Sequence, residues 1–153
     1  MKRGTILNAD LNHAIASMGH GETMIVCDAG FPIPRGVWRI DLAVIQDVPD
    51  LATVLGAIAG EFITEKVAYA DTLPAHNAPL LSLLQRLFPD ADHAMIPHEV
   101  ILTEMAAKAK VIVRTGAFDP WGNIILSSGV DVPKWFAKPG VVPPAYYAAK
   151  MGK

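Results

Sequence analysis

Helical and extended hydrophobic patterns alternate along the 153-residue chain, which is typical of a layered α/β domain. Apolar residues three or four positions apart predict amphipathic helices at residues 11–18, 51–58, 78–88 and 97–105. Compact apolar runs with β-branched residues predict buried strands at residues 23–27, 40–45, 66–70, 110–114 and 124–126. We expect Gly19 to cap the first helix at its C-terminus, and Pro49 to occupy the first turn of the second.

The C-terminal part of the chain has a different pattern. From Asp131 onward, prolines alternate with aromatic residues, namely Pro133, Trp135, Phe136, Pro139, Pro143, Pro144, Tyr146 and Tyr147. The prolines argue against regular structure, whereas so many aromatic side chains are rarely left in water. We therefore expect a domain of residues 1–130, followed by an extension of residues 131–153 that packs on its own or a neighbouring subunit.

Composition changes this picture in one respect, the apolar content. Hydrophobic residues make up 52% of the chain, and about 60% when its 12 glycines are included, against roughly 45–50% in an ordinary globular domain. The longest stretch without Asp, Glu, Lys or Arg runs only from Thr72 to Gln85 and contains two prolines, too short for a membrane span. Excess apolar surface without a span indicates self-association, so we expect a homo-oligomer.

Charge and cysteine content exclude several classes of protein. A net charge of −2 without a basic cluster gives no electrostatic signature of nucleic-acid or membrane binding. The single cysteine, Cys27, lies inside a predicted apolar strand, where a thiol is usually inert packing. No apolar leader follows the basic N-terminus, so we expect a cytoplasmic protein.

Two polar residues flank the strand predicted at residues 23–27. Asp28 follows it directly, and ligands of open α/β sheets lie beyond the carboxyl ends of strands; the alternative is that Asp28 only caps the next turn. His20 lies between two glycines that leave its ring unshielded; the alternative is a loop histidine without a role.

Two further positions carry candidate chemistry. His98 follows Pro97 at a predicted helix start, where the helix dipole favours a neutral ring that acts as base or hydrogen-bond acceptor; simple capping is the alternative. The Trp121-Gly122-Asn123 segment lies before the last predicted strand. It is either an anchored turn or a sugar platform, with an indole face against C–H bonds and an amide on hydroxyls.

Dinucleotide, phosphate-loop and zinc sites have little support in the sequence. Gly19-His20-Gly21 lacks the third glycine and the preceding strand of a dinucleotide fingerprint, and no Gly-Lys-Ser/Thr is present. The histidines show no zinc-helix spacing, and we interpret His13 and His76 as solvent-facing. We expect neither a metal nor an organic cofactor.

Several short segments follow one another in a recognisable order and spacing: Lys2–Asn8 (KRGTILN), Gly19-His20, Cys27–Pro34 (CDAGFPIP), Arg39–Ala43 (RIDLA), Val48-Pro49, His98-Glu99, Arg114–Gly116 (RTG), Pro120–Leu126 (PWGNIIL) and Gly129-Val130. Together they resemble the ribose pyranase/L-fucose mutarotase family over residues 1–130.

The resemblance implies a three-layer α/β/α domain with a mixed central sheet. It implies a cofactor-free isomerase that interconverts the pyranose and furanose forms of free D-ribose, with subunits in rings that stack into a decamer and sites near subunit boundaries. The family residue matching His20 is the catalytic acid/base. Those matching Asp28, His98, Trp121, Gly122 and Asn123 bind the sugar.

This chemistry suits the residues themselves. A change of ring size passes through the open-chain aldehyde and needs one positioned acid and one base, which contribute about 10²–10⁴-fold. Our hypothesis is that His20 transfers the proton and Asp28 orients either His20 or a sugar hydroxyl, while His98 and Asn123 hold hydroxyls.

The chain departs from the family pattern in three places. Trp121 stands where the family typically has tyrosine, so an indole N–H, which only donates, replaces a phenol. Gly21-Glu22 and Gly122-Asn123 are more similar to the fucose branch, whereas the longer Cys27–Pro34 and Arg39–Ala43 segments are similar to the ribose branch. The extension continues past the usual family end. The alternatives are a mutarotase for L-fucose or another monosaccharide, and a sugar-binding subunit without turnover.

Overall fold

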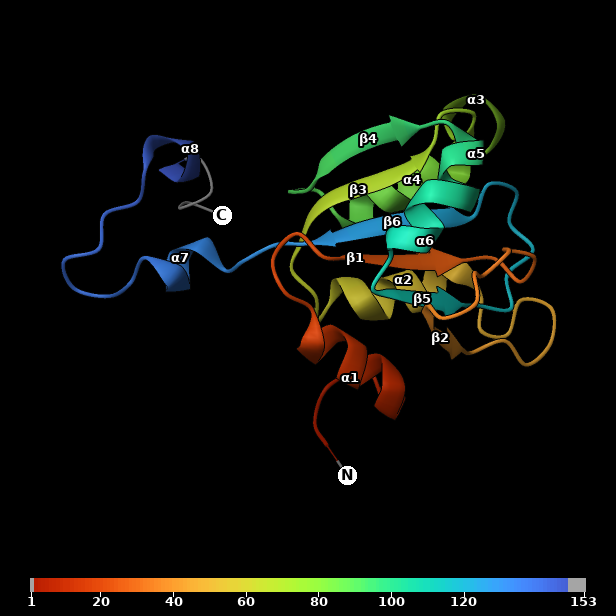
Figure 1. Ribbon diagram of the computed structural model, residues 1–153, viewed down its shortest axis with the longest axis horizontal. Helices are drawn as coiled ribbons and strands as arrows, with labels where there is room; N and C mark the ends of the chain where they lie inside the picture. Colours follow the sequence, from red (N-terminus) through yellow and green to blue (C-terminus); the bar gives the residue numbers. More distant parts are fainter. Residues whose placement is uncertain (1, 149–153) are drawn as a thin grey trace.

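A mixed six-stranded sheet forms the centre of the computed structural model, which describes residues 2–148. Its strands are β1 Thr23–Cys27, β2 Trp38–Asp41, β3 Thr64–Ala70, β4 Asp92–Ile96, β5 Val111–Arg114 and β6 Asn123–Ser128, in the order β2-β5-β1-β6-β3-β4. β6 pairs antiparallel with β1 and β3, and the other pairs are parallel. Five strands therefore run in one direction, and β6 runs against them (Figure 1).

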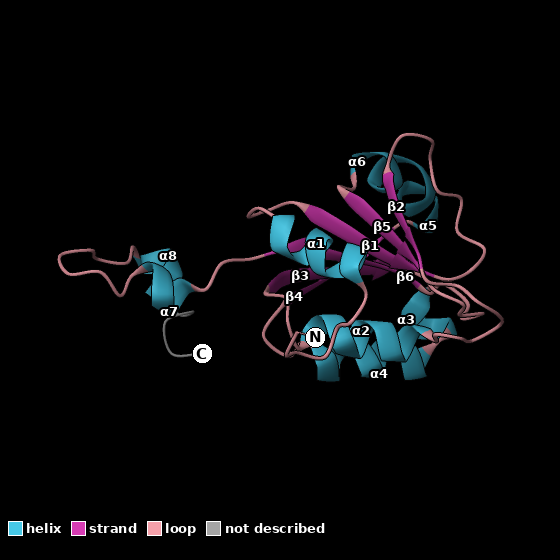
Figure 2. Ribbon diagram, turned by 90° about the horizontal axis from the view of Figure 1, so that it is seen from below, coloured by secondary structure: helices cyan, strands magenta, loops and turns pink. Residues whose placement is uncertain are grey.

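Helices cover both faces of this sheet (Figure 2). One face carries α2 Leu51–Ala59, α3 Leu73–His76 and α4 Ala78–Leu87, and the other carries α1 Ala9–Ser17 and the segment α5 His98–Val100, η1 Ile101–Met105 (a π-helical turn) and α6 Ala106–Lys108. The central strand β1 is buried from Met24 to Cys27, because a strand covered on both faces is apolar throughout. The predicted three-layer α/β/α class is confirmed.

Local sequence accounts for most helix boundaries. Asn8, Asp50 and Asn77 cap α1, α2 and α4, each accepting a backbone N–H with its side chain. Two predicted boundary roles are wrong. α1 ends on Met18 in an extended conformation, so no left-handed Gly19 is needed there. Pro49 precedes the cap Asp50 and lies outside the first turn of α2.

The strand predicted at residues 40–45 is shifted, because β2 ends at Asp41. The chain then folds back on itself, and Val44 donates its N–H to the carbonyl of Val48. β4 and α3 were not predicted from the sequence. β4 is an edge strand whose residues are exposed or only partly buried, so it has no apolar alternation from which it could be predicted.

The extension after Gly129 leaves the body of the molecule at the end of β6 (Figures 1 and 2). It contains two short helices, α7 Val132–Trp135 and α8 Ala145–Ala148, which corrects the expectation of no regular structure. Pro133 lies in the first turn of α7, where its missing N–H costs nothing. Trp135 is 54% and Tyr146 75% exposed in the single chain, so packing on a neighbouring subunit stays a prediction. Residues 149–153 lie outside the described part.

None of the helices in residues 2–148 has the length and hydrophobicity needed to cross a bilayer.

Candidate functional site

The carboxyl ends of the parallel strands and the start of β6 meet at one edge of the sheet, which we call the carboxyl edge. Asp28 follows β1, His98 follows β4 after Pro97, and Asn123 is the first residue of β6. The strand directions thus bring together three of the predicted site residues that lie 25 to 95 positions apart in the chain.

Asp28 is the most constrained group at the carboxyl edge. Its Oδ1 accepts the N–H of Gly30 at 2.7 Å, and its own N–H donates to the carbonyl of Gly122 at 2.9 Å. The turn-capping role considered above is therefore present, but it occupies one carboxylate oxygen. Burial raises the pKa of Asp28, while hydrogen bonds from Gly30 and Asn123 and the nearby charge of His98 oppose that rise.

His98 and Asn123 each present a buried polar atom without a partner. Within residues 2–148, His98 Nε2 and Asn123 Oδ1 are inaccessible to solvent and make no hydrogen bond. An unsatisfied buried polar atom costs about 1–3 kcal/mol, so such atoms beside a carboxylate fit hydroxyl groups of a ligand. His98 is the first residue of α5, and no side chain caps that helix; the simple capping role is not observed.

The Trp121-Gly122-Asn123 segment is held in an unusual backbone conformation. Trp121 has φ 56°, in the left-handed region that a large side chain rarely adopts. Gly122 donates to the carbonyl of Asp119 at 3.0 Å, and a Cβ on it would lie 2.8 Å from that same oxygen. The indole ring of Trp121 packs 5.0 Å from the ring of His76, centroid to centroid. His76 is exposed as predicted, but it has this further contact.

A cavity of about 460 Å³ adjoins this segment, lined by Asp28, Ala29, Gly30, Arg114, Ala117, Phe118, Asp119 and Pro120. Arg114 ends β5, donates to the carbonyl of Ala29 at 2.9 Å and pairs with Asp41 at 3.1 Å. Asp119 has a raised pKa because of burial and the charges of Asp47, Asp50 and Asp28. Arg114 and Asp119 are not among the site residues predicted from the sequence, although the strand-end rule applied to Asp28 points equally to Arg114.

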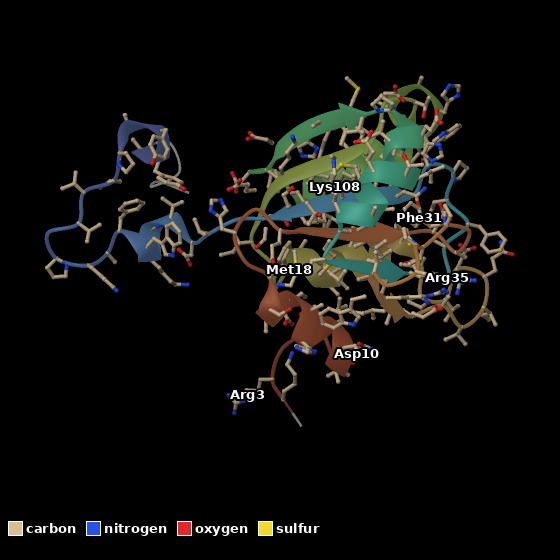
Figure 3. All side chains as sticks on the ribbon, in the orientation of Figure 1. Arg3, Asp10, Met18, Phe31, Arg35 and Lys108 are labelled. Atoms are coloured by element: carbon tan, nitrogen blue, oxygen red, sulfur yellow. The ribbon has the colours of Figure 1, made fainter. Side chains whose placement is uncertain are left out.

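His20 lies at the opposite end of β1. It occupies the turn between α1 and β1, where Gly21 has φ 80° and donates to the carbonyl of Ser128 at 2.9 Å. In Figure 3, the labelled Met18 lies toward the start of β1, and Phe31 lies beyond its far end. A five-residue strand spans roughly 16 Å at about 3.3 Å per residue. A single chain therefore does not bring His20 and Asp28 to one small sugar.

His20 has two neighbours that were not predicted from the sequence. Its Nε2 lies 3.0 Å from Oε2 of Glu65 on β3, and its ring lies 6.2 Å from that of Trp135, almost perpendicular to it. The predicted strand began at Lys66, so Glu65 fell outside it. Starting β3 two residues earlier, at Thr64, would have placed a carboxylate at this edge.

Neither Cys27 nor a metal-binding cluster forms part of the candidate site in the described residues. The Cys27 thiol is buried, donates to the carbonyl of Val113 and has a pKa raised by burial, in agreement with inert packing. In the described part of the chain, no group of three or more His, Cys, Asp or Glu side chains is arranged to hold a metal ion.

Comparisons with known proteins agree with this architecture. The model of the RbsD / FucU transport protein family matches residues 1–131. D-ribose pyranase 2 of Rubrobacter xylanophilus is 54% identical over 153 residues, covering all of this chain and 99% of that protein. D-ribose pyranase 1 of Streptomyces griseus is 52% identical over 151 residues, covering 99% of this chain and all of that protein.

Solved structures place the fold in the same group. Bacillus subtilis RbsD complexed with D-ribose is 35% identical, with a TM-score of 0.80 over 85% of this chain and 98% of that one. The fucose mutarotase of Streptococcus pneumoniae in complex with L-fucose is 20% identical and shares the fold, with a TM-score of 0.64 over 81% of this chain and 94% of that one. The chain belongs to the RbsD / FucU transport protein family.

Proposed function

We propose that this protein is a D-ribose pyranase, a mutarotase that interconverts the pyranose and furanose forms of free D-ribose. The observation that carries the proposal is the polar group at the carboxyl edge, where buried His98 Nε2 and Asn123 Oδ1 have no hydrogen-bond partner among residues 2–148 and lie beside Asp28. The comparisons favour ribose over fucose. The relatives named D-ribose pyranase are 54% and 52% identical over essentially the whole chain, whereas the fucose mutarotase structure is 20% identical.

The reaction exchanges protons and one C–O bond within the sugar. The anomeric hydroxyl loses its proton as C1 becomes a carbonyl, the C1–O5 bond breaks, and O5 gains a proton. The 4-hydroxyl of the open-chain aldehyde then adds to C1, loses its proton and closes the furanose, while the carbonyl oxygen is protonated. No electrons enter or leave the sugar, so an acid/base group and hydroxyl-binding groups are sufficient.

His20 is the acid/base group in this proposal, and Glu65 orients it. An ionised carboxylate only accepts hydrogen bonds, so the tautomer with its proton on Nε2 is the one that fits the 3.0 Å contact with Glu65. Nδ1 is then the atom that takes and returns the sugar's proton. Asp28, His98 and Asn123 hold the hydroxyls, and the Trp121 indole packs against C–H groups.

We further propose that each site is completed by two copies of the chain. The length of β1 separates His20 from Asp28 in one copy, so the His20 end of one subunit must face the carboxyl edge of another. Large apolar side chains are exposed in the single chain, among them Leu7, Val44, Ile45 and Phe118, and such patches mark association surfaces. The expected assembly is a ring-based decamer in the cytoplasm, which sedimentation of the purified protein and cell fractionation test.

Saturation-transfer NMR on free sugars tests the function. At catalytic concentrations, the protein should accelerate exchange between ribopyranose and ribofuranose, and His20→Ala should lower that rate by about 10²–10⁴-fold. The same measurement on L-fucose, D-galactose and D-allose serves as a panel. Faster exchange of L-fucose than of ribose would assign the fucose activity instead. Line broadening without exchange would indicate a binding subunit without turnover.

A further inference from the structure

The extension brings an aromatic ring to the proposed acid/base residue. Trp135, the last residue of α7, lies 6.2 Å from His20, ring centroid to ring centroid, at an interplanar angle of 86°. This edge-to-face arrangement is one that aromatic pairs prefer. Trp135 is nevertheless 54% exposed, so much of its indole surface is open beside a histidine that must meet substrate.

The first residues of the extension pack on the body of the molecule and thereby fix the position of Trp135. Val132 is 4% exposed, Gly129 donates to the carbonyl of Ile63 at 2.8 Å, and Trp135 donates to the carbonyl of Asp131 at 2.9 Å. Asp131 also caps α7 by accepting the N–H of Lys134. Beyond this start the chain runs away from the body through α7 and on to α8 (Figures 1 and 2).

Residues 130–133, at the start of the extension, line a cavity next to Glu65, the partner of His20. This cavity of about 290 Å³ lies between the start of β3 and residues 130–133, and its lining includes Glu65, Val132 and Pro133. The extension therefore contributes both a ring against His20 and apolar surface beside Glu65. Two independent contacts connect it to the acid/base end of the sheet.

Only part of the family has a chain of this length. The family model ends at residue 131, and the D-ribose pyranase of Levilactobacillus brevis aligns over 130 residues, 98% of its own length. The Rubrobacter xylanophilus relative instead aligns over all 153 residues. Trp135 is thus an addition to a domain whose chemistry does not require it, which suits a role in affinity and not in bond breaking.

We propose that Trp135 is a sugar-contacting residue of the His20 half of the site, packing its indole against the C–H face of the bound sugar. The inference rests on the proposed ribose pyranase function. An aromatic contact of this kind corresponds to about a 3- to 10-fold change in binding. Trp135→Ala should therefore raise KM for ribose exchange by that factor with little change in kcat, and Trp135→Phe should recover most of the affinity.

The test compares three variants in the full-length protein. Tyr146→Ala is the matched control, since it removes an exposed aromatic residue of the same extension whose ring contacts Tyr147 and is not seen against His20. Exchange NMR gives KM and kcat, and sedimentation checks that the subunit number is unchanged. A readout independent of turnover is the Trp135 indole N–H resonance, which should shift on ribose addition.

The outcomes separate this inference from the function on which it rests. An inactive wild type whose Trp135 resonance still shifts with ribose would refute the activity and support the contact. A KM in Trp135→Ala equal to that in Tyr146→Ala, with an unmoved indole resonance, would overturn the contact. So would a loss of kcat accompanied by a smaller assembly, because Trp135 would then act through subunit packing.

Discussion

Mixing two inactive variants should restore activity, because His20 and the carboxyl edge are too far apart to serve one sugar from one chain. One variant is His20→Ala, and the other combines Asp28→Asn with His98→Ala. Each retains the half of the site that the other has lost. β1 places roughly 16 Å of extended strand between the two halves, so the proposed site takes one half from each of two subunits.

The expected magnitude follows from random assembly. In a 1:1 mixture, a site is intact only when its His20 comes from the carboxyl-edge variant and its Asp28 from the His20→Ala variant, which occurs in about one quarter of sites. The His20→Ala parent should retain at most about 1% of wild-type exchange. Recovery to about one quarter of the wild-type rate is therefore well above the background of the His20→Ala parent, and the second parent is measured alone for comparison.

The assay is saturation-transfer NMR on ribose with co-expressed subunits, whose mixing is verified by native mass spectrometry. His20→Ala mixed with His20→Gln is the matched control and should show no rescue, because every site then lacks the acid/base group. Mixed oligomers of the first pair with no more activity than their parents would refute the reasoning. His20 and Asp28 would then have to act within a single chain.

Three further predictions concern stability. Glu61 accepts hydrogen bonds from Ile6 and Thr5, which lower its pKa from 4.5 to about 2. The ionised carboxylate therefore stabilises the fold above pH 4.5, and this stabilisation is lost as the pH falls toward 2. In thermal melts, the Tm of Glu61→Gln should be lower than that of the wild type above pH 4.5, and the difference should vanish as the pH falls toward 2. Burial raises the pKa of Asp28 above 3.8, so the stability that its carboxyl group contributes is present below that pH and is lost as the pH rises. Asp28→Asn should therefore have a higher Tm than the wild type at pH 7 and the same Tm below about pH 3.8. A Tm difference that does not change over this pH range would contradict the raised pKa. Gly122→Ala forces a Cβ to 2.8 Å from the Asp119 carbonyl oxygen. The free energy of unfolding measured by urea denaturation should fall by about 1–3 kcal/mol, and titration calorimetry should show weaker ribose binding. Wild-type values of both quantities would show that the backbone of this segment moves to accommodate the methyl group.

Local pattern was sufficient for much of the fold. Thr23–Cys27 was predicted with the bounds that β1 has, because a strand covered on both faces needs an unbroken apolar run. The apolar spacing that predicts an amphipathic helix at residues 51–58 comes from Leu51, Val54, Leu55 and Ile58, and these are the buried residues of α2. β4 escaped prediction because an edge strand with partly buried residues has no such signature.

The candidate site divides in the same way. Asp28 and His98 were chosen from their places after predicted strands or at helix starts, and parallel strand directions make such residues neighbours. Glu65 and Trp135 could not be assigned to His20, since they lie 45 and 115 positions further along the chain and only the packing of β3 and α7 beside the α1–β1 turn creates the contacts.

By itself, then, the amino-acid sequence determined the layered α/β class, the central strands and the polar residues at strand ends, because burial and capping act over a few neighbouring residues. Tertiary structure alone decided which of those residues meet. It gathered Asp28, His98 and Asn123 at the carboxyl edge and placed His20 at the other end of β1 with Glu65. The physical reason is strand direction: a strand that carries one group at each end holds the two groups a full strand length apart.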